Sequence, residues 1–382
     1  MTPRAIACVA GCLVALAAAP LSAQVAPLKI SGLVELSGTG ATSGTNFDNG
    51  VKLAVKEINA AGGILGRRIE YTSGDTQSNP QIAKALAQRA VDEGAYVVMG
   101  PVFSGSIMVS MAETRKAGIP NFTGGEAASI TLQGNPYIFR TSFTQTTAMP
   151  KVARYLASDL KARNVAMIWV NNDFGKGGRD TMMKELDKLG LKVVADISTD
   201  PGQVDFSGAV LRAKQSNADA LFVYTNEEES ARALRELRKQ GYDKPIVGET
   251  VLTSQKVIEL AGDSANGAVA HVGLTADAPQ AAIKTFNEKF QQEYKSKGDH
   301  NALKGYSGMY IVKVLTERLG KADSKAFAAA MHGAKFTVKE NPGVLLDVTF
   351  DNNGDLDRES FMTKVVNGKQ EVVATLPPAS AK

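Results

Sequence analysis

The stretch that decides the fold reads LKISGLVEL at residues 28–36, NFDNGVKLAVKEINAA at 46–61 and RIEYTS at 68–73. The first and last runs are short and mainly apolar or β-branched, which predicts strands. The middle run repeats apolar residues at spacings of three and four, which predicts a helix with one buried face. Gly62-Gly63 follows that helix, and glycine often ends helices because it adopts the left-handed conformation at low cost. A strand, a helix and a second strand in this order are typical of a parallel sheet.

The same alternation continues along the chain in two series. Strands are predicted at 96–100, 165–170, 191–197, 220–225 and 245–248, and helices at 79–93, from 104, and at 175–189, 206–215 and 227–240. The second series starts after Phe139-Arg140-Thr141. Repeated units of this kind give parallel sheets with helices on both faces. We therefore predict an α/β protein of two doubly wound lobes, with a cleft beyond the carboxyl ends of the strands.

The first 23 residues differ from the rest in composition. Arg4 precedes an apolar stretch from Ile6 to Ala19, and Leu21-Ser22-Ala23 resembles a signal-peptidase site. This layout predicts a secretory signal peptide that is cleaved after Ala23. The 14 apolar residues are too few to span a bilayer core of about 30 Å. Val9-Ala10-Gly11-Cys12 also resembles a lipoprotein box, so lipidation of Cys12 is the alternative.

Composition excludes several classes of protein. Cys8 and Cys12 both lie in the leader, so the mature chain would contain neither a disulfide framework nor a thiolate nucleophile. The 43 basic and 39 acidic residues are interspersed, which argues against a nucleic-acid partner. Removing 23 of 382 residues leaves 359, more than one typical core holds.

Motifs for enzymes, cofactors and metals are incomplete. The loop Gly38–Gly44 has Ser43 where a dinucleotide fingerprint requires glycine. Residues 351–362 resemble a calcium loop but have Leu356 at the sixth position, where glycine is needed. The three histidines are 29 and 32 residues apart, which is not the spacing of a metal-binding pair. We therefore predict no enzymatic activity, no cofactor and no metal.

A longer run, NGVKLAVKEINAAGGILG at Asn49–Gly66, resembles the opening of the leucine/isoleucine/valine-binding protein family. Shorter matches follow in the same order at 100–106, 117–120, 139–141, 205–207, 260–263 and 350–356. Members of this family are periplasmic substrate-binding components of branched-chain amino acid ABC transporters. The resemblance implies the type I periplasmic binding protein clamshell, in which three crossovers join two lobes.

The resemblance also implies how the chain is divided. One lobe would contain 24–141 and 275–350, and the other 146–272 and 356–378, with crossovers near Thr141, Gly273 and Asp351. It further implies a periplasmic location, a small-molecule ligand, an ABC transporter permease as the membrane partner, and a monomer.

Candidate ligand contacts in the first lobe follow from the same resemblance. Ser104 matches a serine that holds the ligand's carboxylate at a helix start, where unpaired N–H groups favour an anion. A plain helix N-cap is the alternative for this serine. Gly124, Gly125 and Glu126 match a second segment that grips the carboxylate, although Glu126 replaces a small hydroxyl residue. Phe103 would line the pocket for the ligand's side chain.

The second lobe supplies the remaining candidates. Phe174 matches an aromatic residue that closes over the ligand, with a core role as the alternative. Tyr224 lies at the end of a predicted strand at the cleft side, and Glu227 follows that strand. Glu249, or Thr250 beside it, matches the position that receives the ligand's α-ammonium group. An anion-binding site and a carboxylate in one cleft would suit a zwitterion, because a buried ammonium group must be paired with a negative charge.

These observations favour a solute-binding protein that captures a small amino acid-like ligand and delivers it to a permease. Aromatic or other small carboxylates and short amides are the alternative ligands, because Glu126 and Phe103 depart from the family pattern. A ligand-sensing subunit of a signalling receptor is a further alternative. A secreted enzyme on the same scaffold is disfavoured by the incomplete motifs.

Overall fold

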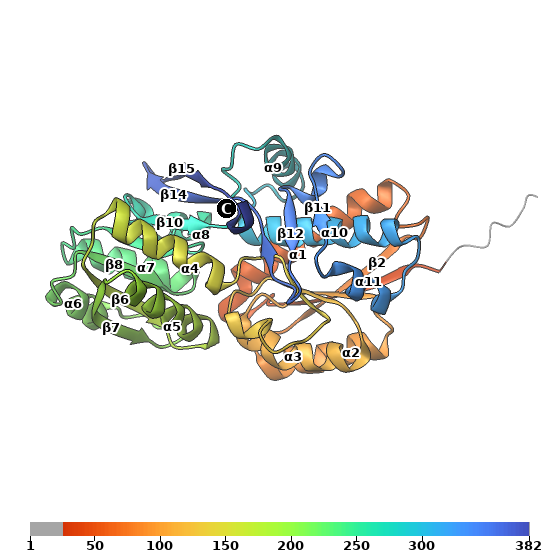
Figure 1. Ribbon diagram of the computed structural model, residues 1–382, viewed down its shortest axis with the longest axis horizontal. Coiled ribbons are helices and arrows are strands. Elements are labelled where there is room, and N and C mark those ends of the chain that lie inside the picture. Colours follow the sequence, from red (N-terminus) through yellow and green to blue (C-terminus); the bar gives the residue numbers. More distant parts are fainter. Residues whose placement is uncertain (1–25, 382) are drawn as a thin grey trace, which may run out of the picture.

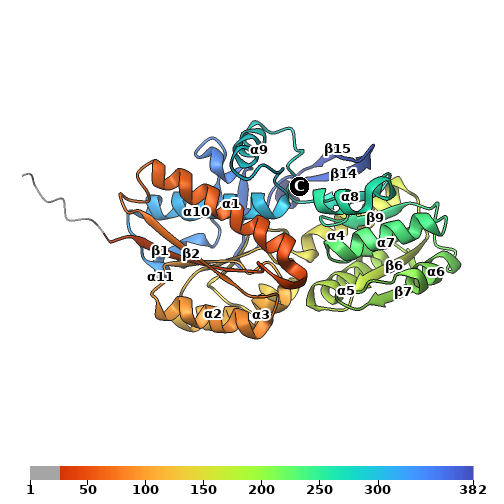
Figure 2. The same ribbon diagram turned by 180° about the vertical axis from the view of Figure 1, so that it is seen from behind.

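The structure is a computed structural model that describes residues 26–381. The expected signal peptide, its cleavage site after Ala23, and Cys8 and Cys12 lie outside the described residues. Two lobes lie side by side along the long axis, and the C-terminal end lies near their junction (Figure 1). The view from behind shows the same arrangement (Figure 2).

The first lobe contains a parallel five-stranded sheet in the order β2-β1-β3-β4-β5. Its strands are β1 Leu28–Val34, β2 Ile69–Asp75, β3 Val97–Met99, β4 Asn121–Thr123 and β5 Ile138–Arg140. Its helices are α1 Ala41–Ala60, α2 Pro80–Asp92, α3 Ser104–Ala117, α9 Ala281–Tyr294, α10 His300–Leu319 and α11 Ser324–Met331. The predicted strands and first three helices are confirmed, although α1 begins five residues before residue 46.

The helices of this lobe cover both faces of the sheet (Figure 1). α1 packs against α10 on one face, and α2 packs against α3 on the other. A Cβ at Gly50 of α1 would lie 2.0 Å from the carbonyl oxygen of Ala302 in α10, so the two helix backbones come this close only because residue 50 is glycine. This contact fixes the start of α10 against the first lobe.

The second lobe contains a seven-stranded sheet in the order β15-β14-β10-β9-β8-β6-β7. Its strands are β6 Asn164–Val170, β7 Lys192–Thr199, β8 Ala220–Tyr224, β9 Ile246–Glu249, β10 Val269–Val272, β14 Ser360–Val366 and β15 Lys369–Leu376. Its helices are α4 Gln145–Arg154, α5 Asp173–Lys188, α6 Ser207–Gln215, α7 Glu227–Lys239 and α8 Gln255–Ala261. Apolar residues of α4 and α5 pack on one face of the sheet, and those of α6, α7 and α8 on the other.

The doubly wound parallel sheet is confirmed, but two strands that the sequence analysis did not predict, β14 and β15, extend it antiparallel. Asn367 and Gly368 alone connect these strands, and both have positive φ angles of 49° and 71°. A two-residue turn with this backbone joins antiparallel neighbours, whereas parallel neighbours need a long crossover.

Shorter elements complete the described chain. A small sheet consists of β11 Lys335–Phe336, β12 Val348–Phe350 and β13 Leu356–Asp357. Tyr155–Asp159 forms a π-helical turn. The 3-10 turns are Gly38–Gly40, Ala128–Ile130, Gly262–Ala265, Pro342–Val344 and Ala379–Ala381.

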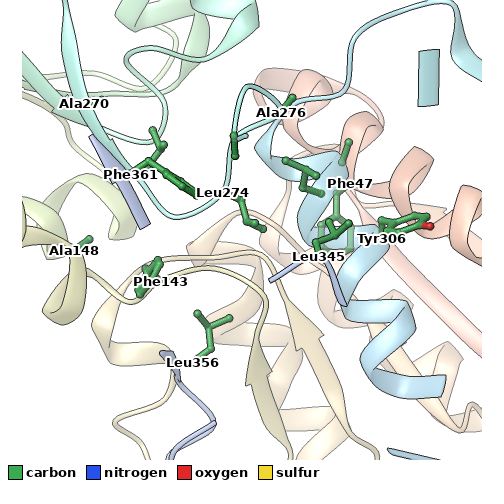
Figure 3. Packing of buried hydrophobic residues seen from close by; sticks show 14 of the residues in the cluster. Phe47, Phe143, Ala148, Ala270, Leu274, Ala276, Tyr306, Leu345, Leu356 and Phe361 are labelled. Atoms are coloured by element: carbon green, nitrogen blue, oxygen red, sulfur yellow. The ribbon is translucent and has the colours of Figure 1, made fainter. Parts of the chain in front are cut away.

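Three segments cross between the lobes, after β5, after β10 and after β12. Each contributes a buried apolar side chain to one cluster: Phe143, Leu274 and Leu356 lie in the same region in Figure 3. The three crossing segments, which form the hinge, therefore share one apolar core with both lobes. The limits of the lobes given above stay a prediction.

Candidate ligand-binding site

A cavity of about 320 Å³ lies between the lobes, within the range of small-molecule sites. The first lobe contributes the starts of α3 and α10 and the loop after β4, and the second contributes the starts of α5 and α7. Seven of the nine residues that the sequence predicts as ligand contacts line this cavity: Phe103, Ser104, Gly124, Gly125, Glu126, Phe174 and Glu227.

The start of α3 is an open binding site for an anion. Its N-cap residue is Phe103, whose side chain has no oxygen to accept from the first-turn amides. The first backbone hydrogen bond of the helix runs from Ile107 N to Phe103 O, 3.0 Å, so the amides of residues 104–106 precede it. Ser104 Oγ accepts from Ala127 N at 3.3 Å, which leaves its hydroxyl proton for another acceptor. The helix dipole favours a negative charge here.

Glu35 holds the backbone that leads into this anion-binding site. Its carboxylate accepts from Val102 N and Phe103 N, each at 3.1 Å. Burial raises the pKa of Glu35 to about 7, although these two hydrogen bonds oppose the shift. The carboxylate thus fixes the backbone that leads into α3.

The loop after β4 approaches the cavity through Gly124 and Gly125, but their amides are already paired. Gly124 N donates to Pro101 O at 3.1 Å, and Gly125 N donates to Thr123 Oγ1 at 3.3 Å. To bind a ligand's carboxylate, these amides would have to exchange their present partners, so this contact stays a prediction. Arg140, fully buried, donates to Gly125 O at 2.7 Å and holds the loop in place.

Glu126 forms a buried ion pair that the sequence did not predict. Its carboxylate lies 3.2 Å from Lys304 Nζ, which also lies 3.4 Å from Gly124 O. Burial raises the pKa of Glu126 to about 7, the nearby charge of Glu249 adds to this shift, and Lys304 opposes it. Glu126 is thus a buried carboxylate paired with Lys304 at the wall of the cavity.

Phe174 lies at the cavity and also packs against the core of the second lobe, while its closure over a ligand stays a prediction. It lines the cavity, and its ring stacks on Tyr224 with centroids 4.1 Å apart. Tyr224 lies behind it: its hydroxyl accepts from Gln145 Nε2 at 3.1 Å and donates to Glu126 Oε2 at 3.4 Å. The latter hydrogen bond connects the two lobes beneath the cavity.

Tyr224, Glu249 and Thr250 are not among the described residues that line the cavity, and their direct contact with a ligand stays a prediction. The β9–β10 register pairs Glu249 with His271, and Glu249 Oε1 lies 3.2 Å from His271 Nδ1. Thr250 Oγ1 donates to the same oxygen at 2.6 Å. Burial raises the pKa of Glu249 and lowers that of His271 to about 3.

Glu227 is a buried carboxylate of the second lobe that lines the cavity. It begins α7, is 3% exposed, and accepts from Ser43 Oγ of α1 at 2.7 Å. Burial raises the pKa of Glu227 to about 7, opposed by the hydrogen bond from Ser43. A second bond across the mouth runs from Thr42 Oγ1 to Glu228 Oε1, 3.2 Å. These two hydrogen bonds join the lobes across the cleft.

A family model described as periplasmic binding protein matches residues 27–370. The chain belongs to the periplasmic binding protein family. Leu/Ile/Val-binding protein homolog 7 of Brucella abortus (strain 2308) is 31% identical to it, over 97% of both chains. Leu/Ile/Val-binding protein BraC3 of Rhizobium johnstonii is 27% identical, over 91% of this chain and 93% of its own.

A solved structure of this family confirms the clamshell fold. The branched-chain amino acid transporter substrate-binding protein LivJ of Streptococcus pneumoniae, in complex with isoleucine, superposes with a TM-score of 0.83. The two chains are 25% identical, and the match covers 92% of this chain and all of LivJ.

Sequence reasoning missed several lining residues of this periplasmic binding protein. They include Ser43 of α1, Asn172 and Asp173 at the start of α5, and three residues of α10, His300, Asn301 and Lys304. Asp299 could have predicted where α10 begins, because aspartate is a common N-cap residue. In the structure its carboxylate accepts from Asn301 N and Ala302 N at 2.9 and 3.0 Å. Local pattern could predict that helix but not its position in the cleft.

Two structural absences hold for residues 26–381. In that range, no group of three or more His, Cys, Asp or Glu side chains is placed to hold a metal ion. Nor does any helix in the same range combine the length and apolar character needed to cross a membrane.

Proposed function

We propose that this periplasmic binding protein captures a small amino acid between its lobes and delivers it to an ABC transporter permease. One observation carries the proposal: the same cavity contains an uncapped helix start on the first lobe and the buried carboxylate of Glu227 on the second. An α-amino acid carries the two complementary charges. Its carboxylate would bind at Ser104 and the start of α3, and its ammonium would pair with Glu227.

This arrangement also explains how binding favours closure. A ligand that contacts both lobes interacts more strongly with the closed form, and this differential affinity shifts the population towards it. The Ser43–Glu227 and Thr42–Glu228 hydrogen bonds add contacts that exist only when the lobes approach. The permease would then recognise the closed form and receive the ligand chemically unchanged, so no catalytic step is proposed.

The family relationship supports the same ligand class. The relatives compared above are named Leu/Ile/Val-binding proteins, and LivJ was solved with isoleucine. We further propose export to the periplasm with cleavage after Ala23, a monomer in solution, and lobes of 24–141 plus 275–350 and 146–272 plus 356–378.

An aromatic carboxylate is the second candidate ligand. Phe103 and Phe174 approach the cavity from opposite lobes and could contact the faces of a ring. The carboxylate of such a ligand would bind at the start of α3, and the ligand would make no ion pair with Glu227. The requirement for an ammonium group therefore separates the two candidates.

A calorimetric panel tests the proposal. It should contain the standard amino acids, their desamino analogues such as 4-methylpentanoate for leucine, and benzoate. We expect a 1:1 complex with at least one amino acid and a large loss of affinity for its desamino analogue. Binding of benzoate with the amino acids inactive would favour the second candidate, and equal affinity for an amino acid and its desamino analogue would contradict the role of Glu227.

A further inference from the structure

Asn301 is a buried amide in the cavity with both ends of its side chain unpaired. It is the second residue of α10, is 1% exposed, and lines the cavity. Neither Oδ1 nor Nδ2 has a hydrogen-bond partner within residues 26–381, and no other side-chain amide in that range has both atoms buried and unpaired. Buried polar groups are nearly always paired in native proteins, so this pair of atoms indicates a missing partner.

The position of Asn301 does not depend on its side chain. Asp299 caps α10 by accepting from the backbone amides of Asn301 and Ala302. Asn46 Nδ2 in turn donates to the other oxygen of Asp299 at 2.9 Å. The helix start is therefore held by neighbours, and the carboxamide of Asn301 is free to serve a ligand.

The surroundings of Asn301 favour a neutral partner over a charged one. Lys304, three residues on, lies on the same face of α10, and its charge is balanced by Glu126 at 3.2 Å. His300 is uncharged, because burial lowers its pKa well below the ordinary value. A second ligand carboxylate would lack a free cation here and would also face the oxygen of Asn301.

We propose that Asn301 is a specificity-determining residue, and that the cleft selects amino acids whose side chain carries a neutral group able to donate and accept hydrogen bonds, with a carboxamide as the best match. A carboxamide can pair with both Oδ1 and Nδ2 at once, and a hydroxyl with either atom or both. An aliphatic side chain would leave both atoms of Asn301 buried and unpaired. This inference rests on the function proposed above and defines the ligand class of the same site.

Near-isosteric ligand pairs provide the test. Calorimetry should compare asparagine with leucine, threonine with valine, and glutamine with methionine, on the wild-type protein and on Asn301→Leu. We expect the wild type to bind the polar member of at least one pair about tenfold or more tightly than its apolar partner, since sites built for a hydrogen bond reject analogues that lack it. Asn301→Leu should reverse that order.

Gln292→Leu is the matched control, because it makes the same kind of change at an exposed position of α9 and should leave the ranking unchanged. Apolar members binding as well as or better than polar ones in the wild type would overturn the inference, while the proposed function would stand. Binding of an amino acid outside all three pairs, with these six inactive, would overturn it too. If no amino acid binds, the proposed function fails with it. Should Asn301→Leu not fold, the wild-type ranking alone decides.

Discussion

Proton release from Glu227 is the most informative consequence of the proposed ammonium contact. Burial raises the pKa of this carboxyl to about 7, so at pH 6 about nine-tenths of the free protein holds the proton. An ammonium group placed beside Glu227 favours the ionised form and lowers the pKa. Binding at pH 6 should therefore release close to one proton per ligand, and at pH 8 almost none.

The affinity should change in the same direction. If the ligand binds only when Glu227 is ionised, the dissociation constant should fall about tenfold between pH 6 and pH 8, equivalent to about 1.4 kcal/mol. Titration calorimetry in buffers of different ionisation enthalpy measures the protons released. The amino acid that binds most tightly in the panel should be used throughout.

Two variants identify the source of the proton. Glu227→Gln should abolish the proton release and flatten the pH dependence of binding. Glu228→Gln is the matched control, because this neighbouring carboxylate is not among the described residues that line the cavity and accepts a hydrogen bond from Thr42 instead. Proton release that persists in Glu227→Gln would refute the assignment and point to Glu126, whose pKa is also raised to about 7.

Two further predictions concern stability. Arg140→Met should lower the free energy of unfolding, measured by urea denaturation, by about 3–5 kcal/mol. The reason is that Asp355 and the carbonyls of Gly125 and Ala127 would lose their buried cation. A change below about 1 kcal/mol would contradict the role given to this side chain. Glu35 has a folded-state pKa of about 7, whereas the ordinary pKa of an exposed glutamate is 4.5, so the native state binds more protons than the unfolded state between these pH values. Its contribution to the free energy of unfolding, up to about 3 kcal/mol, is therefore present at pH 4.5 and is lost as the pH rises to 7. Glu35→Gln should flatten this part of the stability–pH curve. An unchanged slope in this variant would contradict the raised pKa of Glu35.

Local pattern was sufficient for much of the fold because strands and helices differ in hydrophobic period. The strands β1 to β3 and β6 to β9 follow from this difference, as do the helices α1 to α3 and α5 to α7, whereas β4, β5 and α4 were not predicted. Asn367-Gly368 is a typical two-residue hairpin turn and could have predicted the antiparallel β14–β15 pair. A pattern of alternating strands and helices does not contain such a turn.

The position of α10 could not be predicted in the same way. Lys304 and Asn301 reach the cavity because the chain returns to the first lobe after β10 and α10 packs closely against Gly50. That contact joins residues more than 250 positions apart, and no local period encodes it. The site's ion pair and its unpaired amide therefore became visible only in the structure.

Glu249 shows a different limit. The sequence places it correctly at the end of a strand, but its direction depends on register, since successive side chains of a strand point to opposite faces. The β9–β10 pairing turns it towards His271. Glu227, at a helix start one strand earlier, faces the cavity instead.

Filling the cavity is the most direct test of where the ligand binds. Gly105, the second residue of α3, lines the cavity, and a Cβ there would meet only the end of the Asp173 side chain at 3.1 Å and Pro80 at 4.0 Å. Gly105→Leu should therefore fold yet occupy the space of the ligand. Gly208→Leu is its matched control, because Gly208 is the second residue of α6 and a Cβ there meets nothing within 4 Å.

The decisive measurement is a calorimetric titration of wild type, Gly105→Leu and Gly208→Leu with the amino acid that binds most tightly in the panel. The proposed cleft predicts 1:1 binding to wild type and Gly208→Leu with the same affinity, and at least about a hundredfold loss in Gly105→Leu, equivalent to about 2.7 kcal/mol. Equal affinity of all three proteins would show that the ligand binds elsewhere and would contradict the account.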